Sequence, residues 1–466
     1  MPSFQERANN LFLSVLFVLL AAWQLDMHPA GMHSEHSYST FQIARNIILT
    51  GQPSFDGLYV TNGFHLLWMA VLSGLAAPLA QTIPVETALI GVALLPVLIF
   101  AWITRPLVFV QILVAVYLTG FGTEGVFAAL LFIALAWALQ ARSRAIVLVL
   151  TLAIVLTRID YLICTGVLII WAWAKDRQFL APIIVGSLLG VIAYAAMHWA
   201  IAEELYSVSL LQKGVLQQAT SLDGVLQRTI ENFAAVENQI RIAAWLGAIV
   251  TLLISYFTLG IDRQRIIFNP LFHLALYAFL LVHGFVSTLG EWYFAAPLLV
   301  AIYAAGKASP DLKWRAAPAI LFCIVIPIGA SGVQFFQAWD ASREYAKMID
   351  STSEVDGPVF AYEGSAYLAW RRHPVPVLNG NGVMSTFEFA RNSGNAAWLT
   401  SYLAEHEVKQ FAGTPELGVC PVPGLCCGAR TLEPGADYPH RDAEHIDRIY
   451  IFKGGSPCPL LHSDQN

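Results

Sequence analysis

The chain is 466 residues long, has a net charge of −6 at neutral pH, and is 57% hydrophobic but only 12% charged. A soluble protein of this length has too little interior to hide so much apolar surface, and soluble domains carry about twice this share of charged residues. With a mean hydropathy of +0.59, the composition argues against a soluble protein, and the negative charge gives no indication of a nucleic-acid partner.

The long apolar runs lie almost entirely within residues 1–335. A membrane-spanning helix needs about 20 mostly apolar residues, so twelve runs, several of them short, are candidates. The runs are 10–25, 63–80, 86–104, 106–119, 124–140, 145–157, 161–174, 179–200, 242–260, 267–287, 291–305 and 315–335. The first run is interpreted as a signal-anchor helix because no clear cleavage site follows it.

Lysine and arginine in short loops predict which side of the membrane each loop occupies. Arg7 places the N-terminus in the cytoplasm, and the basic loops from residue 142 onward alternate as cytoplasmic. Loops 26–62 and 201–241 and the segment 336–466 are then on the outer face. This orientation requires an odd number of spans, so we predict about eleven (range 10–12), with run 106–119 re-entrant or broken.

Residues 336–466 have the composition of a soluble domain, and we predict a small α/β domain on the periplasmic side. Cys420, Cys426, Cys427 and Cys458 all lie in this segment. One or two disulfides are expected in an exported domain, whereas the cysteine spacing matches no standard zinc finger. Cys164 lies in an apolar run and is expected to be an inert core thiol.

The first outer loop is dense in polar residues, among them Glu35, His36, Asn62 and His65. A carboxylate held at the membrane surface can act as a general base or a metal ligand. An ordinary solvated loop is the alternative, and composition alone favours it. Residues 38–49 form an amphipathic stretch, and residues 201–241 are expected to form helices lying on the membrane.

Three ionisable residues are flanked by apolar runs: Glu124, Arg158 and Asp160. Such groups are costly within a membrane and are usually either functional or paired with one another. Arg158 could therefore take part in the function of the site, or it could neutralise the two carboxylates as a structural contact. All three map to the outer face, which predicts a single outward-facing site.

Two further features lie on the outer side. Lys213 could meet a lipid phosphate, although a lone lysine in a loop is usually solvated. Trp292 and Tyr293 could form a wall that contacts a sugar or an isoprenoid chain. An interfacial aromatic belt without further function is the favoured alternative for this pair.

The ordered motifs resemble those of bacterial GT-C-fold glycosyltransferases, multi-spanning enzymes that use polyprenyl-phosphate sugars. The matching segments are 38–46, 54–57, 61–68, 122–124 and 157–160, with weaker matches at 209–213, 292–294 and 379–382. The family's tandem acidic pair falls on Glu35 and His36 of this chain. A histidine therefore stands where the family has a second carboxylate.

The resemblance implies a GT-C-like helical bundle that transfers a sugar from a polyprenyl-phosphate donor to an envelope glycan, lipid or protein at the outer face of a bacterial inner membrane. It makes Glu35 the catalytic base, with His36 beside it, and allows a divalent metal at Glu35 and His36. Arg158 or Lys213 would hold the departing phosphate. The residues expected to orient or contact the substrate are Glu124, Asp160, Asn62, His65, Trp292 and Tyr293.

Two other functions remain open. The altered acidic pair would suit a non-catalytic relative that serves as a binding or assembly partner in surface-glycan biogenesis. A lipid or glycan transporter is disfavoured, because the sequence lacks paired interrupted segments in matching halves.

Overall fold

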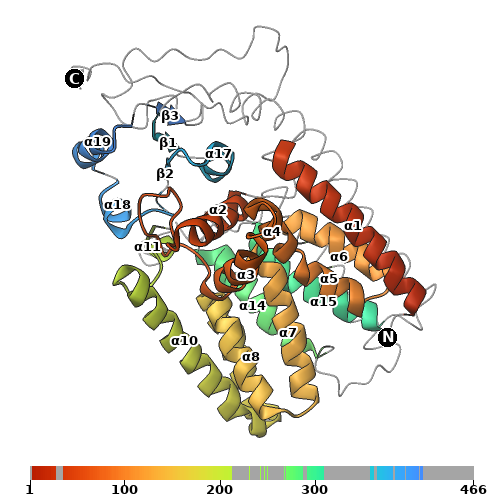
Figure 1. The fold of residues 1–466 in the computed structure, drawn as a ribbon. Coiled ribbons are helices and arrows are strands. Elements are labelled where there is room, and N and C mark those ends of the chain that lie inside the picture. Colours follow the sequence, from red (N-terminus) through yellow and green to blue (C-terminus); the bar gives the residue numbers. More distant parts are fainter. Residues whose placement is uncertain are drawn as a thin grey trace.

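The chain folds into a mainly helical body with a small α/β domain on one side (Figure 1). In the computed structural model the described residues are 3–27, 35–212, 269–286, 291–308, 357–361, 365–380, 382, 384–393, 395–408 and 410–412, with single positions between 230 and 267. Helices form over each predicted apolar run in this part of the chain. Run 315–335 lies outside the described residues, and run 242–260 is described only at single positions.

Thirteen helices are described in the first 308 residues. They are α1 (Phe4–Met27), α2 (Glu35–Thr50), α3 (Leu66–Leu79), α4 (Val85–Ala93), α5 (Leu95–Ile103), α6 (Pro106–Thr119), α7 (Glu124–Gln140), α8 (Arg144–Thr157), α9 (Leu162–Lys175), α10 (Leu180–Ala202), α11 (Val208–Gln212), α14 (Pro270–Val286) and α15 (Ala295–Ala308). Short 3-10 turns lie at η1 (Ile159–Tyr161), η2 (Arg177–Phe179) and η5 (Glu291–Phe294).

The predicted break in run 106–119 is wrong, because α6 is one unbroken helix of 14 residues. The interruption lies in the preceding run, where α4 gives way to α5 at Leu94. Pro96 follows in the first turn of α5, a position that tolerates its missing N–H. Hydropathy gave no sign of where a break would fall, because both runs are strongly apolar.

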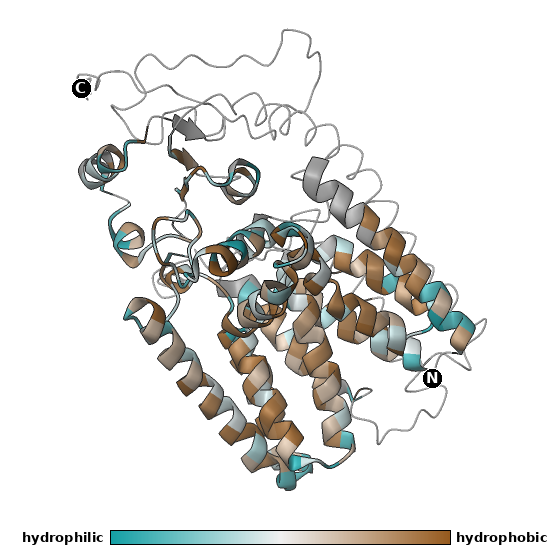
Figure 2. Cartoon of the chain, viewed as in Figure 1, coloured by the Kyte–Doolittle hydropathy of each residue, from teal (hydrophilic) through white to brown (hydrophobic). Residues whose placement is uncertain are grey.

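Within the described residues, two helical segments are long and apolar enough to cross a membrane: Val85–Ile103 and Arg177–Ala202. Several apolar side chains of α10 are more than half exposed, among them Leu188 (58%), Ile192 (63%) and Trp199 (56%). Figure 2 shows hydrophobic residues along this helix. An apolar surface of this kind is stable against lipid and costly in water.

The number of spans stays a prediction. Helices α6, α8 and α9 have 14 residues each. At 1.5 Å per residue, 14 residues reach about 21 Å, which is shorter than a hydrocarbon core of about 30 Å. Adjoining non-helical residues would have to complete each crossing.

Small residues let the helices of the body approach closely. Gly186 and Gly190 on α10 face α8, and a Cβ at Gly186 would lie 2.6 Å from the Leu148 carbonyl oxygen. On α7, a Cβ at Gly125 would lie 2.4 Å from the Cβ of Ala295. Close backbone approach through small residues is typical of helix packing in membranes.

The C-terminal segment contains the α/β structure that its composition predicted. Strands β1 (Val359–Ala361), β2 (Val377–Asn379) and β3 (Gln410–Ala412) form a parallel sheet in the order β2-β1-β3. Helices α17 (Ser365–Arg372), α18 (Phe387–Asn392) and α19 (Ala396–Glu405) accompany the sheet. The four tail cysteines lie outside the described residues, whereas Cys164 is a buried free thiol, as expected.

This α/β domain docks on α2 through α17 (Figure 1). The rings of Tyr38 and Tyr367 meet edge to face with their centroids 5.1 Å apart. The Arg45 guanidinium lies 4.5 Å from the ring centroid of Trp370 and donates to the Trp370 carbonyl oxygen at 3.2 Å. The segment predicted as the first outer loop therefore contains a 16-residue helix, α2, which packs between the α/β domain and helices α3 and α4.

Candidate functional site

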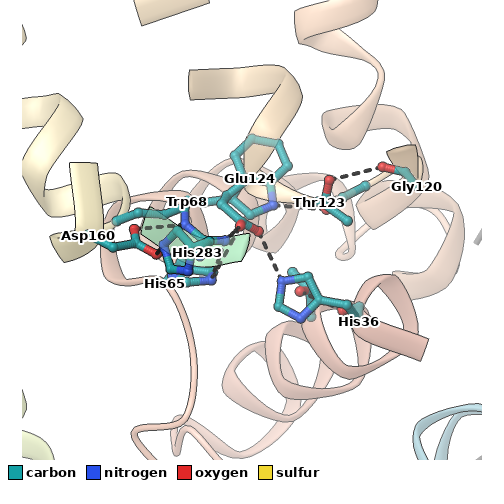
Figure 3. Close-up of polar contacts among 11 residues, drawn as sticks. His36, His65, Trp68, Gly120, Thr123, Glu124, Asp160 and His283 are labelled. Atoms are coloured by element: carbon teal, nitrogen blue, oxygen red, sulfur yellow. Dashed lines mark hydrogen bonds and ion pairs between the residues drawn. The ribbon is translucent and has the colours of Figure 1, made fainter. Parts of the chain in front are cut away.

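Ionisable side chains from four separate segments meet near the start of α7 (Figure 3). Glu124 is at the centre and is fully buried. Its carboxylate contacts His36 from α2, His65 at the start of α3, and Arg158 after α8. Asp160, in η1, contacts Arg158 from the other side.

The turn before α7 places Glu124 at the first position of that helix. Gly120 and Gly122 both have positive φ, +85° and +87°, a conformation that glycine adopts readily. The Gly122 carbonyl oxygen accepts a hydrogen bond from Trp68 Nε1 at 2.9 Å. A carboxylate at a helix N-terminus is stabilised by the helix dipole, so the position suits an ionised glutamate.

Arg158 lies between two carboxylates. Its Nε donates to Asp160 Oδ1 at 3.0 Å and its Nη2 to Asp160 Oδ2 at 2.6 Å, a two-pronged contact, while its Nη1 donates to Glu124 Oε1. Tyr293 covers the guanidinium, with its ring centroid 4.6 Å from Arg158 Cζ. Two carboxylates and one guanidinium leave one negative charge uncompensated among these three side chains.

Two imidazoles complete the surroundings of Glu124. His36 Nε2 lies 3.0 Å from Glu124 Oε2, and His65 Nε2 lies 3.3 Å from Glu124 Oε1. The His65 side chain is 27% exposed. The ring of His36 stacks on Trp292, with centroids 4.7 Å apart and an interplanar angle of 25°.

One residue of the site escaped sequence reasoning. His283, on α14, lies 2.9 Å from Asp160 through its Nε2, and its ring packs 4.2 Å from that of Tyr293. The signal was present, because a histidine inside the apolar run 267–287 is an ionisable group in a candidate span. Nothing in the sequence indicated which carboxylate it would meet.

The predicted residues divide into three groups. His36, His65, Glu124, Arg158, Asp160, Trp292 and Tyr293 come together at the site. The favoured belt interpretation of Tyr293 is wrong, since this side chain is buried against Arg158. Lys213 and the side chain of Glu35 lie outside the described residues, although α2 begins at Glu35.

Asn62 has a different role from the one expected. Its side-chain amide donates to the Tyr206 carbonyl oxygen at 2.9 Å and accepts from the Val208 backbone N–H at 2.8 Å. Asn62 therefore joins the segment between α2 and α3 to the segment at the start of α11. Both ends of its side chain are used in these hydrogen bonds, so the geometry favours a structural role for Asn62.

An apolar groove of about 410 Å³ lies between α3, α4, α5 and α7. Trp68 and Phe127 line it, and Phe127 comes three residues after Glu124 on α7. Since Trp68 also donates to Gly122, this side chain contacts both the groove and the turn that places Glu124. An apolar groove and a charged cluster therefore share adjoining elements.

Neither protein-family models nor curated proteins match this chain. The chemistry of the site is therefore argued from its geometry. A buried arginine held by two carboxylates can meet a phosphate through its remaining N–H groups. An imidazole held by a carboxylate can accept a proton, and the two imidazoles with Glu124 are close enough together that they could hold a metal ion.

Proposed function

We propose that this chain is a membrane glycosyltransferase of the GT-C type, which moves a sugar from a polyprenyl-phosphate donor to a cell-envelope acceptor. The supporting observation is the convergence of motifs. Segments 61–68, 122–124 and 157–160 contribute His65, Glu124, Arg158 and Asp160 to one cluster. A structural ion pair alone would not require two imidazoles and two aromatic rings around the same carboxylates.

Arg158 is the group that would hold the donor phosphate. As the bond to the anomeric carbon breaks, negative charge grows on the departing phosphate, and a fixed guanidinium stabilises that charge. Asp160 holds the guanidinium by two hydrogen bonds, and His283 in turn contacts Asp160. This chain of contacts fixes the direction of the arginine before substrate arrives.

His36 is the base that the geometry favours. With Nε2 facing Glu124, its Nδ1 atom can take the proton of an acceptor hydroxyl, and the carboxylate stabilises the imidazolium that forms. This arrangement moves the catalytic role from Glu35, the sequence-based assignment, to its neighbour. The family's second carboxylate is then replaced by an imidazole that a distant glutamate supports.

The surroundings suit a lipid donor and an envelope acceptor. The apolar groove beside α7 could receive hydrocarbon, and the ring of Trp292, which is only partly buried, could stack against a sugar. The α/β domain sits on α2, where it could position an acceptor. In this proposal the protein is a multi-pass protein of a bacterial inner membrane, with the site and the α/β domain on the periplasmic side.

The test is sugar transfer by the full chain in proteoliposomes, using polyprenyl-phosphate hexoses and pentoses labelled in the sugar and an envelope extract as acceptor. Arg158→Lys keeps a positive charge but loses the planar fork, so we expect transfer to fall at least about 100-fold. Arg391→Lys is the matched control, because Arg391 makes a half-exposed surface pair with Glu204. We expect this variant to transfer at the wild-type rate.

Other results would favour the competing functions. Binding of the donor lipid without transfer under any acceptor condition would support a non-catalytic assembly partner. Movement of labelled lipid across the liposome bilayer without transfer would support a transporter. Equal transfer by Arg158→Lys and the wild type would remove the phosphate-binding role of Arg158.

A further inference from the structure

We propose that His36, His65 and Glu124 form a binding site for one transition-metal ion of the Zn²⁺ class. The three residues come from α2, the start of α3 and the start of α7, and their ligand atoms all lie within 4.8 Å of one another. The site differs from the metal position implied by the family resemblance, which was Glu35 with His36. Metal binding stands on geometry alone, whereas any effect on sugar transfer rests on the proposed function.

The distances between the ligand atoms are compared with those of a tetrahedral metal site. Two ligands at about 2.0–2.1 Å from a tetrahedral Zn²⁺ lie about 3.3 Å apart. His36 Nε2 lies 3.0 Å from Glu124 Oε2, and His65 Nε2 lies 3.3 Å from Glu124 Oε1. The distance from His36 Nε2 to Oε2 is therefore close to the one that two ligands of one ion require. His65 Nε2 lies beside the other oxygen of the same carboxylate, and the rings of His36 and His65 have centroids 5.6 Å apart.

The ligand types select the class of ion. Two imidazole nitrogens and one carboxylate oxygen suit Zn²⁺ and its first-row neighbours, whereas Mg²⁺ and Ca²⁺ prefer sites made of oxygen atoms.

The charge around the site also favours a cation. Glu124 and Asp160 bring two negative charges to the cluster, and Arg158 brings one positive charge. An uncompensated charge among buried groups is costly, so a bound cation next to Glu124 would lower the energy of the cluster. Arg158 occupies Glu124 Oε1, while Oε2 faces His36 and remains available as the ligand atom.

Neighbouring contacts already hold the ligands in place. The guanidinium of Arg158 orients the Glu124 carboxylate, and Trp292 stacks on the His36 ring. Such outer contacts are a regular part of metal sites. Three protein ligands leave a fourth position for an oxygen atom, as in catalytic zinc sites. An acceptor hydroxyl at that position would be activated by the ion in place of the His36 ring.

The experiment measures metal binding without any donor or acceptor. The purified full chain in lipid nanodiscs is stripped with a chelator, its cysteines are alkylated to silence the tail thiols, and it is titrated with Co²⁺ and with Zn²⁺. We expect one ion per chain and the visible absorption bands of tetrahedral Co²⁺. His36→Gln and His65→Gln should each weaken binding by more than about 100-fold, since even an outer contact is worth 10- to 100-fold.

The matched control is His198→Gln. His198 is a buried histidine on α10 whose ring packs on Tyr194, apart from the three ligands. Its replacement should leave the Co²⁺ spectrum and the stoichiometry unchanged. Size-exclusion profiles identify a variant that fails to fold. If one ligand variant fails to fold, the other still tests the site.

Two results would overturn the metal site: no ion bound at micromolar Zn²⁺ by the folded wild type, or equal binding by the wild type and both ligand variants. Because binding is read without substrate, these results leave the transfer assay untouched. A protein that binds Zn²⁺ but transfers no sugar would retain the metal site and lose the proposed function.

Discussion

The turn before α7 sets how closely α2 and α7 approach, and Gly122→Ala tests this. A Cβ at Gly122 would lie 2.4 Å from Cζ and 2.9 Å from Cε2 of Phe41. Phe41 is fully buried on α2, so its ring has no free space to enter. We expect the methyl group to push α2 away from α7, and with it His36 away from Glu124.

The magnitude follows from two separate effects. Gly122 has φ +87°, and a side chain in such a conformation costs about 1 to 3 kcal/mol. Overpacking a filled site costs about 1 to 3 kcal/mol more. Gly51 is the matched control, because its φ is +76° but nothing lies within 4 Å of its Cβ position. The excess destabilisation of Gly122→Ala over Gly51→Ala should therefore be about 1 to 3 kcal/mol.

The assay is reversible unfolding in mixed detergent micelles, which reports the free energy of unfolding of each variant. Adding Phe41→Leu to Gly122→Ala should recover part of the excess, because the shorter side chain leaves room for the new methyl group. Sugar transfer should fall more than about 10-fold in Gly122→Ala, since misplacement by about 1 Å costs up to about 100-fold. Equal destabilisation of the two glycine variants would refute the contact between this turn and α2.

Three further substitutions test the arrangement around the site. Trp370→Ala should lower the free energy of unfolding by about 3 to 5 kcal/mol and speed proteolytic release of the α/β domain. Trp173→Ala, at a site that is 61% exposed, should change neither. Equal release rates for the two variants would contradict the docking on α2. Asn62→Ala should lower the free energy of unfolding by about 1 to 3 kcal/mol, because the buried Val208 N–H and the partly buried Tyr206 carbonyl lose their partner. An unchanged value would disprove the bridge between the two segments. Asp160→Asn should slow sugar transfer by about 10- to 1000-fold, because it weakens the two-pronged contact that holds Arg158. Glu405→Gln, at an exposed position, should have no effect. A wild-type rate for Asp160→Asn would show that this contact is not needed.

Several site residues could be predicted because charge is expensive next to apolar helices. Glu124, Arg158 and Asp160 were visible in the sequence for that reason, and their shared side of the membrane predicted one site. Their partners could not be derived in the same way. His36 lies 88 residues before Glu124 in the chain, and His65 lies between them. No periodicity of the sequence indicates that these three residues meet.

The helices of the body were determined by the sequence itself, because each apolar run is long enough to form backbone hydrogen bonds within its own segment. The α/β character of the C-terminal segment was also a property of its local composition. Only the tertiary structure decided which groups meet. Contacts between α2 and α17, between Asn62 and residues 206–208, and between His283 and Asp160 join segments far apart in the chain. Their geometry depends on how whole helices pack, which is decided by close approaches such as that of Gly122 to Phe41.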